Sequence, residues 1–190
     1  MKLYLNGELV ASDTYTGAVG SWSPDGTYLG KAVKPDAPQH HNFFEGDMDE
    51  VAIWDRTIEQ SEVESLMNSK LAGDETGLVA YYPMDELANN GAVVDLDGDD
   101  DYVYVGTDWK PGTNDFSVGY WLNSTDGNNW RTVQMRGTGG TGSGDPSGFQ
   151  IAGSSGNFGN SFVLDGLGNS VSLSSTDHGI HDGNWHHVVL

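Results

Sequence analysis

A five-residue turn holds the densest set of potential metal ligands in this chain. Residues 97–101 read Asp-Gly-Asp-Asp-Asp. Carboxylate oxygens are hard ligands, so the turn suits calcium better than zinc or copper, although it lacks the full EF-hand spacing. The alternative is a solvated turn whose aspartates accept hydrogen bonds from their own backbone. The residues alone leave both interpretations open.

The histidines give weak support for metal or nucleophilic chemistry. His40 and His41 are adjacent but have no third fixed ligand, which favours a solvated loop over a metal site. His186 and His187 have no serine elbow or cysteine partner, so a catalytic triad has no support. We expect one of this second pair to face the core and the other to face solvent.

Three tryptophans in turn-like segments are candidates for stacking on sugar rings: Trp22, Trp109 and Trp130. An indole ring offers a flat apolar face together with a polar N–H group, which suits both sugar stacking and ordinary packing. The sequence does not decide between these two roles.

Composition excludes several classes of partner and of chemistry. The formal net charge is −20, from 8 basic and 28 acidic residues. Phosphate backbones and anionic lipids require basic surface, so nucleic acid binding and membrane binding are disfavoured. The acidic surplus suits a solvated surface or calcium sites. The chain contains no cysteine, which excludes disulfides, and neither a signal segment nor a membrane span is expected.

The elements that must position these residues are strands joined by turns. Twenty-seven glycines and short apolar runs rich in Val, Tyr and Trp predict an all-β class. The central strand lies within residues 43–56, where strict alternation places Met48, Ala52 and Trp54 on one face. The same alternation places Val51 and Ile53 on the other face, and Asp49 with them in the core.

Local signals predict the remaining elements. Asn6-Gly7 predicts a hairpin turn within 2–10, and apolar spacing predicts a short helix at 59–69. Further strands are expected at 8–12, 27–31, 78–84, 92–96, 102–105, 116–122, 132–135, 148–151, 161–164, 170–173 and 185–190.

Four motifs together resemble laminin G-like, concanavalin A-like jelly-roll domains and, more distantly, the pentraxins. They occupy residues 3–10, 44–56 with Glu62-Val63, 97–103 and 182–188. The resemblance implies a two-sheet antiparallel jelly-roll sandwich, concanavalin A-like, with the short helix near 59–69.

The order of these motifs differs from the family order. Such domains normally begin with a segment like 77–86 and end with one like 43–69, whereas here the ending comes first. One explanation is a single permuted domain over 1–190, with the family's C-terminal half in 1–70, a linker at 70–77 and the N-terminal half in 77–190. Strand 185–190 should then pair antiparallel with 2–10. The other explanation is a slice of a tandem array, completed by exchanging strands with another copy.

The resemblance also implies candidate sites. Some family members place a structural calcium near the acidic turn, which makes Asp97, Asp99 and Asp100 the candidate metal ligands. The pentraxin likeness brings loop 31–42 near loop 137–148, although the acidic ligands expected in the first loop are mostly absent. With the indole of Trp130, the candidate ligand-binding residues are Asp36, His40, His41, Asn42, Trp130 and Asp145.

Related jelly rolls include glucanases with two glutamates flanking an aspartate on one strand. Asp47-x-Asp49-Glu50 is similar, but the first glutamate is missing, and Asp49 is expected in the core. Glycoside hydrolysis needs two correctly separated carboxyl groups. We therefore expect no catalytic residues and no enzyme activity.

The function expected is a non-catalytic binding or adhesion module, extracellular or on a cell or virion surface, for a carbohydrate or protein ligand, with calcium as a structural ion. The alternative is an assembly module of a fibre, surface layer or capsid, which associates with copies of itself through edge strands. A glycan hydrolase is the least favoured of the three.

Overall fold

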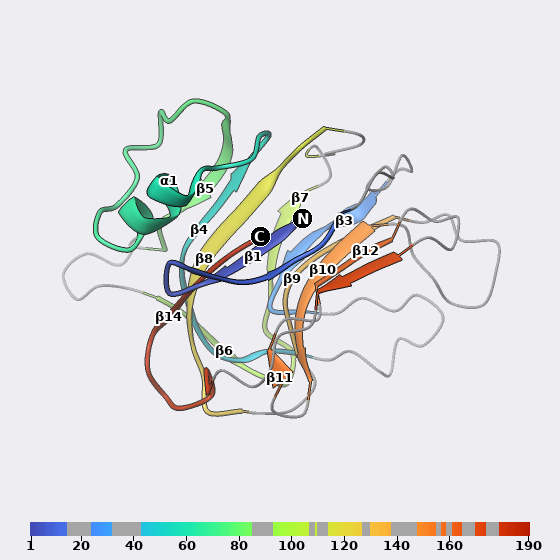
Figure 1. The fold of residues 1–190 in the computed structure, drawn as a ribbon. Helices are drawn as coiled ribbons and strands as arrows, with labels where there is room; N and C mark the ends of the chain where they lie inside the picture. The colour runs from blue at the N-terminus through green and yellow to red at the C-terminus, as the bar shows by residue number, and fades with distance from the viewer. Residues whose placement is uncertain are drawn as a thin grey trace.

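The computed structural model describes residues 1–14, 24–31, 43–84, 93–106, 109, 114–126, 130–137, 148–154, 157–158, 161–164, 170–173 and 179–190. Two antiparallel sheets make up the fold (Figure 1). Sheet 1 has the spatial order β2 (Glu8–Ser12), β1 (Lys2–Leu5), β14 (His186–Val189), β8 (Ser117–Asn123), β4 (Glu45–Trp54) and β5 (Leu78–Tyr82), with β6 (Val94–Asp97) also on β4. Sheet 2 has the order β13 (Ser170–Leu173), β12 (Ser161–Leu164), β10 (Gly148–Ser154), β9 (Trp130–Gly137), β3 (Pro24–Leu29) and β7 (Val103–Gly106), with β11 (Asn157–Phe158) on β10.

This architecture confirms the all-β sandwich predicted from the sequence. The helix is also present as α1 (Gln60–Leu66), shorter than the 59–69 expected. Apart from β11, which had no prediction, each strand lies at or within a few residues of its predicted position. Within the described residues, no helix is long and apolar enough to cross a membrane.

The two chain ends lie side by side in sheet 1 (Figure 1). Strand β1 pairs antiparallel with β14, with Tyr4 opposite Val189 and Leu5 opposite Val188. The hairpin from β1 to β2 turns at Asn6 and Gly7, whose φ values of 49° and 81° are those of the predicted tight turn. The expected pairing is thus present and made within one chain. The assignment of 1–190 to one permuted domain stays a prediction.

The main core fills the space between the two sheets. Sheet 1 contributes side chains such as Leu3, Met48 and Tyr120, and sheet 2 contributes Leu29 and Ile151, all nearly or fully buried. Burial of apolar side chains from both sheets is the main source of stability in such a sandwich.

A bulge in β4 changes which face its residues occupy. The pairing with β8 shifts between Asp49 and Ala52, and Glu50 has a φ of 51°. Because one extra residue is inserted, alternation is interrupted, and Met48 joins Val51 in the main core. The sequence prediction that Met48 shares a face with Ala52 was therefore wrong, as was the prediction that Asp49 points into the core.

The outer face of sheet 1 is covered by α1 and the segment that follows it (Figure 1). A second, smaller cluster forms there from side chains of the sheet, the helix and the segment between β4 and α1: Tyr4, Ala52, Trp54, Ile58, Val63 and Val189. The guanidinium of Arg56 holds the start of the helix, because Nη2 lies 2.6 Å from Oε1 of Glu62 and Nη1 donates to Oε2 at 2.9 Å. These contacts lower the pKa of Glu62 to about 2.

Both C-terminal histidines are buried, which corrects the expectation that one faces solvent. His186 and His187 are 9% and 3% exposed. The imidazole of His186 lies within hydrogen-bond distance of Asp182 Oδ1 (3.0 Å) and of Asn6 Nδ2 (3.1 Å). The region is buried because β14 is an interior strand of sheet 1, between β1 and β8.

Candidate binding pocket beside the β4 bulge

A pocket of about 360 Å³ lies on the outer face of sheet 1, between the bulge of β4 and the segment after α1. We call it the bulge pocket. Its volume is at the lower end of the range for small-molecule sites. The residues that line it are Asp49, Glu50, Leu66, Met67, Asn68, Ser69, Lys70, Trp121 and Trp185.

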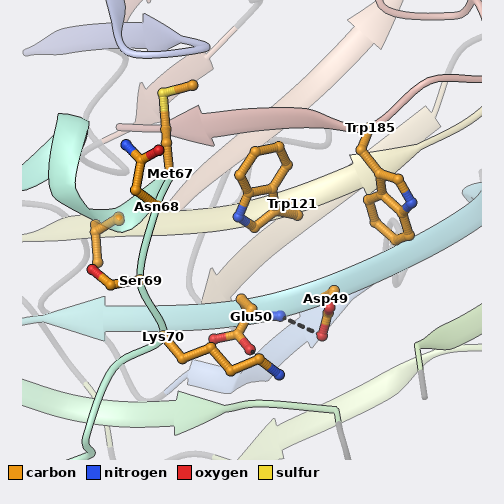
Figure 2. Close-up of a pocket in the computed structure, with 9 residues that line it drawn as sticks. Asp49, Glu50, Met67, Asn68, Ser69, Lys70, Trp121 and Trp185 are labelled. Carbon is orange, nitrogen blue, oxygen red and sulfur yellow. Dashed lines mark hydrogen bonds and ion pairs between the residues drawn. The ribbon is translucent and has the colours of Figure 1, made fainter. Parts of the chain in front are cut away.

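Two indole rings form one side of the bulge pocket. Figure 2 shows Trp121 and Trp185 on one side of the opening, with Asp49, Glu50 and Lys70 on the other. Trp121 is half-buried on β8, whereas Trp185 is 39% exposed. Large exposed aromatic rings beside polar groups are typical of sites that bind ligands.

The Glu50 carboxylate has a partner beside each of its two oxygens. The hydroxyl of Tyr81 donates a hydrogen bond to Oε2. Its other oxygen, Oε1, lies 3.1 Å from Nζ of Lys70. Oε1 is buried and makes no hydrogen bond of good geometry within the described residues, so Lys70 neutralises it as a point charge. The Glu50 side chain is 14% exposed and that of Lys70 is 61% exposed.

The second carboxylate, Asp49, stabilises the backbone of the bulge. Its Oδ1 accepts a hydrogen bond of 2.9 Å from the backbone N–H of Glu50 (Figure 2). That contact supports the left-handed backbone of Glu50, which glutamate adopts only at some energetic cost. Asp49 pairs in register with Trp121 of β8, which places both on the outer face.

A smaller cavity adjoins the bulge pocket and shares four lining residues with it: Glu50, Leu66, Ser69 and Trp121. Its volume is about 10 Å³, enough for roughly one water molecule. His187 also lines it, and the Nδ1 atom of this histidine is buried without a hydrogen-bond partner among the described residues. Burial lowers the pKa of His187 to about 4, so the imidazole is neutral at physiological pH.

The acidic turn after β6 lies apart from the bulge-pocket lining. Carboxylate oxygens of Asp97, Asp100 and Asp101 lie within 4.8 Å of one another. Asp99 is not in this group, while Asp101, which the sequence analysis did not select, is. Oδ1 of Asp97 also accepts the backbone N–H of Asp99 at 2.8 Å, so the backbone hydrogen bonding considered as the alternative is present too.

The other predicted ligand-binding residues cannot be compared with the bulge pocket. Asp36, His40, His41, Asn42 and Asp145 lie outside the described residues. Trp130 belongs to β9, but its side chain is likewise not described.

Sequence reasoning missed the bulge pocket because its parts are distant in the chain. Trp121 and Lys70 are brought together only by the tertiary fold, and both carried weak local signals. Asp47-x-Asp49-Glu50 was noticed, but the assumption of regular alternation put Asp49 in the core. The excess of Asp and Glu near the centre of a strand was the one available clue to a bulge.

Comparisons with known proteins agree with the fold. Residues 1–64 match a laminin G model of the concanavalin A-like lectin/glucanases superfamily. This match confirms the family resemblance over that part of the chain, which includes the whole of β4. Searches of curated proteins and of solved structures found no match.

Proposed function

Since residues 1–64 carry the concanavalin A-like, laminin G-type pattern, we propose that this protein is a non-catalytic binding module for a glycan or protein ligand, with the bulge pocket as its binding site. The proposal includes an extracellular or surface location. The superfamily name covers both lectins and glucanases, and binding is the role proposed for this chain.

The observation that carries the proposal is the pairing of two indole rings with two carboxylates across one opening. Trp121 and Trp185 offer apolar faces for the C–H groups of a sugar ring, while Asp49 and Glu50 offer acceptors for its hydroxyl groups. Carboxylates are strong acceptors, because a hydrogen bond to a charged group is stronger than one between two neutral groups. A protein ligand would use the same features through a polar side chain.

The contacts of Glu50 favour binding over hydrolysis. A glycosidase needs one carboxyl group free to deliver a proton and a second one to act on the opposite side of the bond. In the bulge pocket, Tyr81 and Lys70 engage the two oxygens of Glu50, and the backbone N–H of Glu50 engages Asp49. We therefore expect ligand retention without turnover.

A glycan array tests the proposal with three proteins: the unaltered chain, Trp185→Ala and the control Tyr104→Ala. Tyr104 is 51% exposed on β7 of sheet 2, away from the bulge pocket. The unaltered protein and the control should bind the same glycans, and Trp185→Ala should lose roughly tenfold in affinity. Absence of glycan and protein ligands for the folded, unaltered chain would overturn the proposal.

A structural calcium at the acidic turn is the second part of the proposal. The geometry favours Asp97, Asp100 and Asp101 as ligands, and calcium prefers such oxygen donors. Calcium should therefore raise the unfolding temperature of the unaltered chain. Asp101→Asn should reduce this shift more than Asp99→Asn, which removes a carboxylate outside the group. Equal shifts for both variants would contradict the proposed ligand set.

A further inference from the structure

We infer that the bulge pocket takes a sugar bearing a free amine, with the Glu50 carboxylate as the acceptor for its ammonium group and Lys70 as the group that this ammonium displaces. The inference rests on the proposed function and narrows it to one class of ligand, cationic amino-sugar glycans.

An ammonium group already lies at this position. Nζ of Lys70 is 3.1 Å from Oε1 of Glu50, yet the Lys70 side chain is 61% exposed. Ion pairs with such an exposed partner contribute little, because solvent screens the charge and the long side chain loses entropy. Oε1 also lacks a hydrogen bond of good geometry within the described residues. A ligand ammonium held in place by a ring would supply that directed bond.

The indole rings support a cation carried on a sugar ring in particular. Trp is the aromatic side chain that interacts most favourably with a cation near its face. Trp121 and Trp185 also provide flat surface for the pyranose ring itself. A volume of about 360 Å³ accommodates a ring as well as an ammonium, and so the pocket is larger than a lysine side chain alone requires.

Charge favours an amine over an acetamido group at this position. Lys70 lines the bulge pocket but not the adjoining cavity, so a ligand group that displaces it lies in the bulge pocket. An ammonium group replaces the charge of Lys70 beside the Glu50 carboxylate, whereas an acetamido group is neutral and leaves that carboxylate without a cation.

The net negative charge of the whole chain also favours a cationic glycan as the ligand. A net charge of −20 attracts cationic polymers and repels sulfated or carboxylated ones at long range. The protein should therefore discriminate against anionic glycans, which is a consequence of composition rather than of the pocket alone.

The test compares a tetramer of β-1,4-linked glucosamine with its fully N-acetylated counterpart by titration calorimetry at about pH 6, where the amine carries a proton. The unaltered protein should bind the free-amine tetramer roughly tenfold more tightly. Glu50→Gln should abolish this preference, with Glu8→Gln on the exposed strand β2 as the matched control. Lys70→Gln keeps Glu50 and removes the competing ammonium, so it should tighten binding of the free-amine tetramer, whereas Lys2→Gln should not.

The outcomes separate this inference from the proposed function. Equal binding of the two tetramers would overturn the amine preference and leave a glycan-binding module. Tighter binding of a heparin oligosaccharide, or Glu50-dependent binding of a lysine-rich peptide without binding of either tetramer, would overturn the assignment to an amino sugar. If Lys70→Gln binds the free-amine tetramer with the same affinity as the unaltered protein, the ligand does not displace Lys70, because removal of a competing group must tighten binding. If no glycan binds at all, the proposed glycan function fails with it.

Discussion

Trp121 and His187 face each other across the pairing of β8 with β14, with ring centroids 5.0 Å apart and an angle of 40° between the ring planes. The imidazole is buried and lines the small cavity beside the bulge pocket. A polar ring in this position is neutral and lacks a partner for Nδ1 within the described residues. This single contact links the stability of sheet 1 to the candidate site.

The burial of His187 predicts a loss of stability in mild acid. Its pKa falls from 6.5 to about 4 on folding, so below pH 6.5 the unfolded chain takes up a proton that the folded chain excludes. The contribution of neutral His187 to the free energy of unfolding should therefore be fully present above pH 6.5. It should be lost as the pH falls towards 4, which lowers the free energy of unfolding by up to about 3 kcal/mol. Urea unfolding across this pH range measures the effect.

His187→Phe provides the control for this prediction, because it keeps an aromatic ring against Trp121. Glu50 is the charged side chain that lines the same cavity, and it remains in the variant. The difference in the free energy of unfolding between the unaltered protein and His187→Phe should change with pH by the amount predicted for His187. A pH-independent difference would show that His187 is not the titrating group.

The bulge in β4 predicts very different stability costs for substitutions at two neighbouring residues. Met48 is 1% exposed in the main core, so Met48→Ala should cost about 3 kcal/mol of unfolding free energy. Asp49→Asn keeps an oxygen for the N–H of Glu50 and should cost less than about 1 kcal/mol. Thermal or urea unfolding compares the two variants, and equal costs would place Asp49 in the core after all.

Asn6 secures the pairing of the two chain ends. The side-chain Oδ1 of Asn6 accepts a hydrogen bond from the backbone N–H of His187 at 2.9 Å, and the backbone N–H of Asn6 donates to the carbonyl of His187 at 2.8 Å. Asn6→Ala removes the side-chain acceptor and places alanine at a φ of 49°, which should cost about 2 kcal/mol. Asn6→Gly loses the same acceptor without the backbone strain and should cost less. The opposite ranking in urea unfolding would exclude this account of the turn.

Local patterns were sufficient to predict most elements of the fold. The Asn6-Gly7 turn and the strand at 116–122 follow from two-residue periodicity and turn chemistry, which need no tertiary information. The order of pairing at the chain ends was also predictable, because the motifs at 3–10 and 182–188 resemble consecutive strands of one family.

The candidate site was far less predictable. Alternation fails at Glu50, and no glycine or asparagine marks the left-handed residue, so the outward position of Asp49 had no local signal. The acidic turn was found because its aspartates lie within five residues of sequence, although the choice among the four depends on three-dimensional distances. Lys70 and Trp121 required the helix to be docked on sheet 1, which depends on long-range packing.

The central claim is that the bulge pocket holds the ligand, and the indole N–H signals of the protein test it directly by NMR. The chain has six tryptophans, and Trp109, which packs against Phe116 beside the main core, serves as an internal reference. Titration with the glucosamine tetramer, or with the glycan that the array ranks first, should shift the signals of Trp121 and Trp185 to saturation while that of Trp109 stays in place. Saturable binding that leaves both pocket signals unchanged would contradict the account.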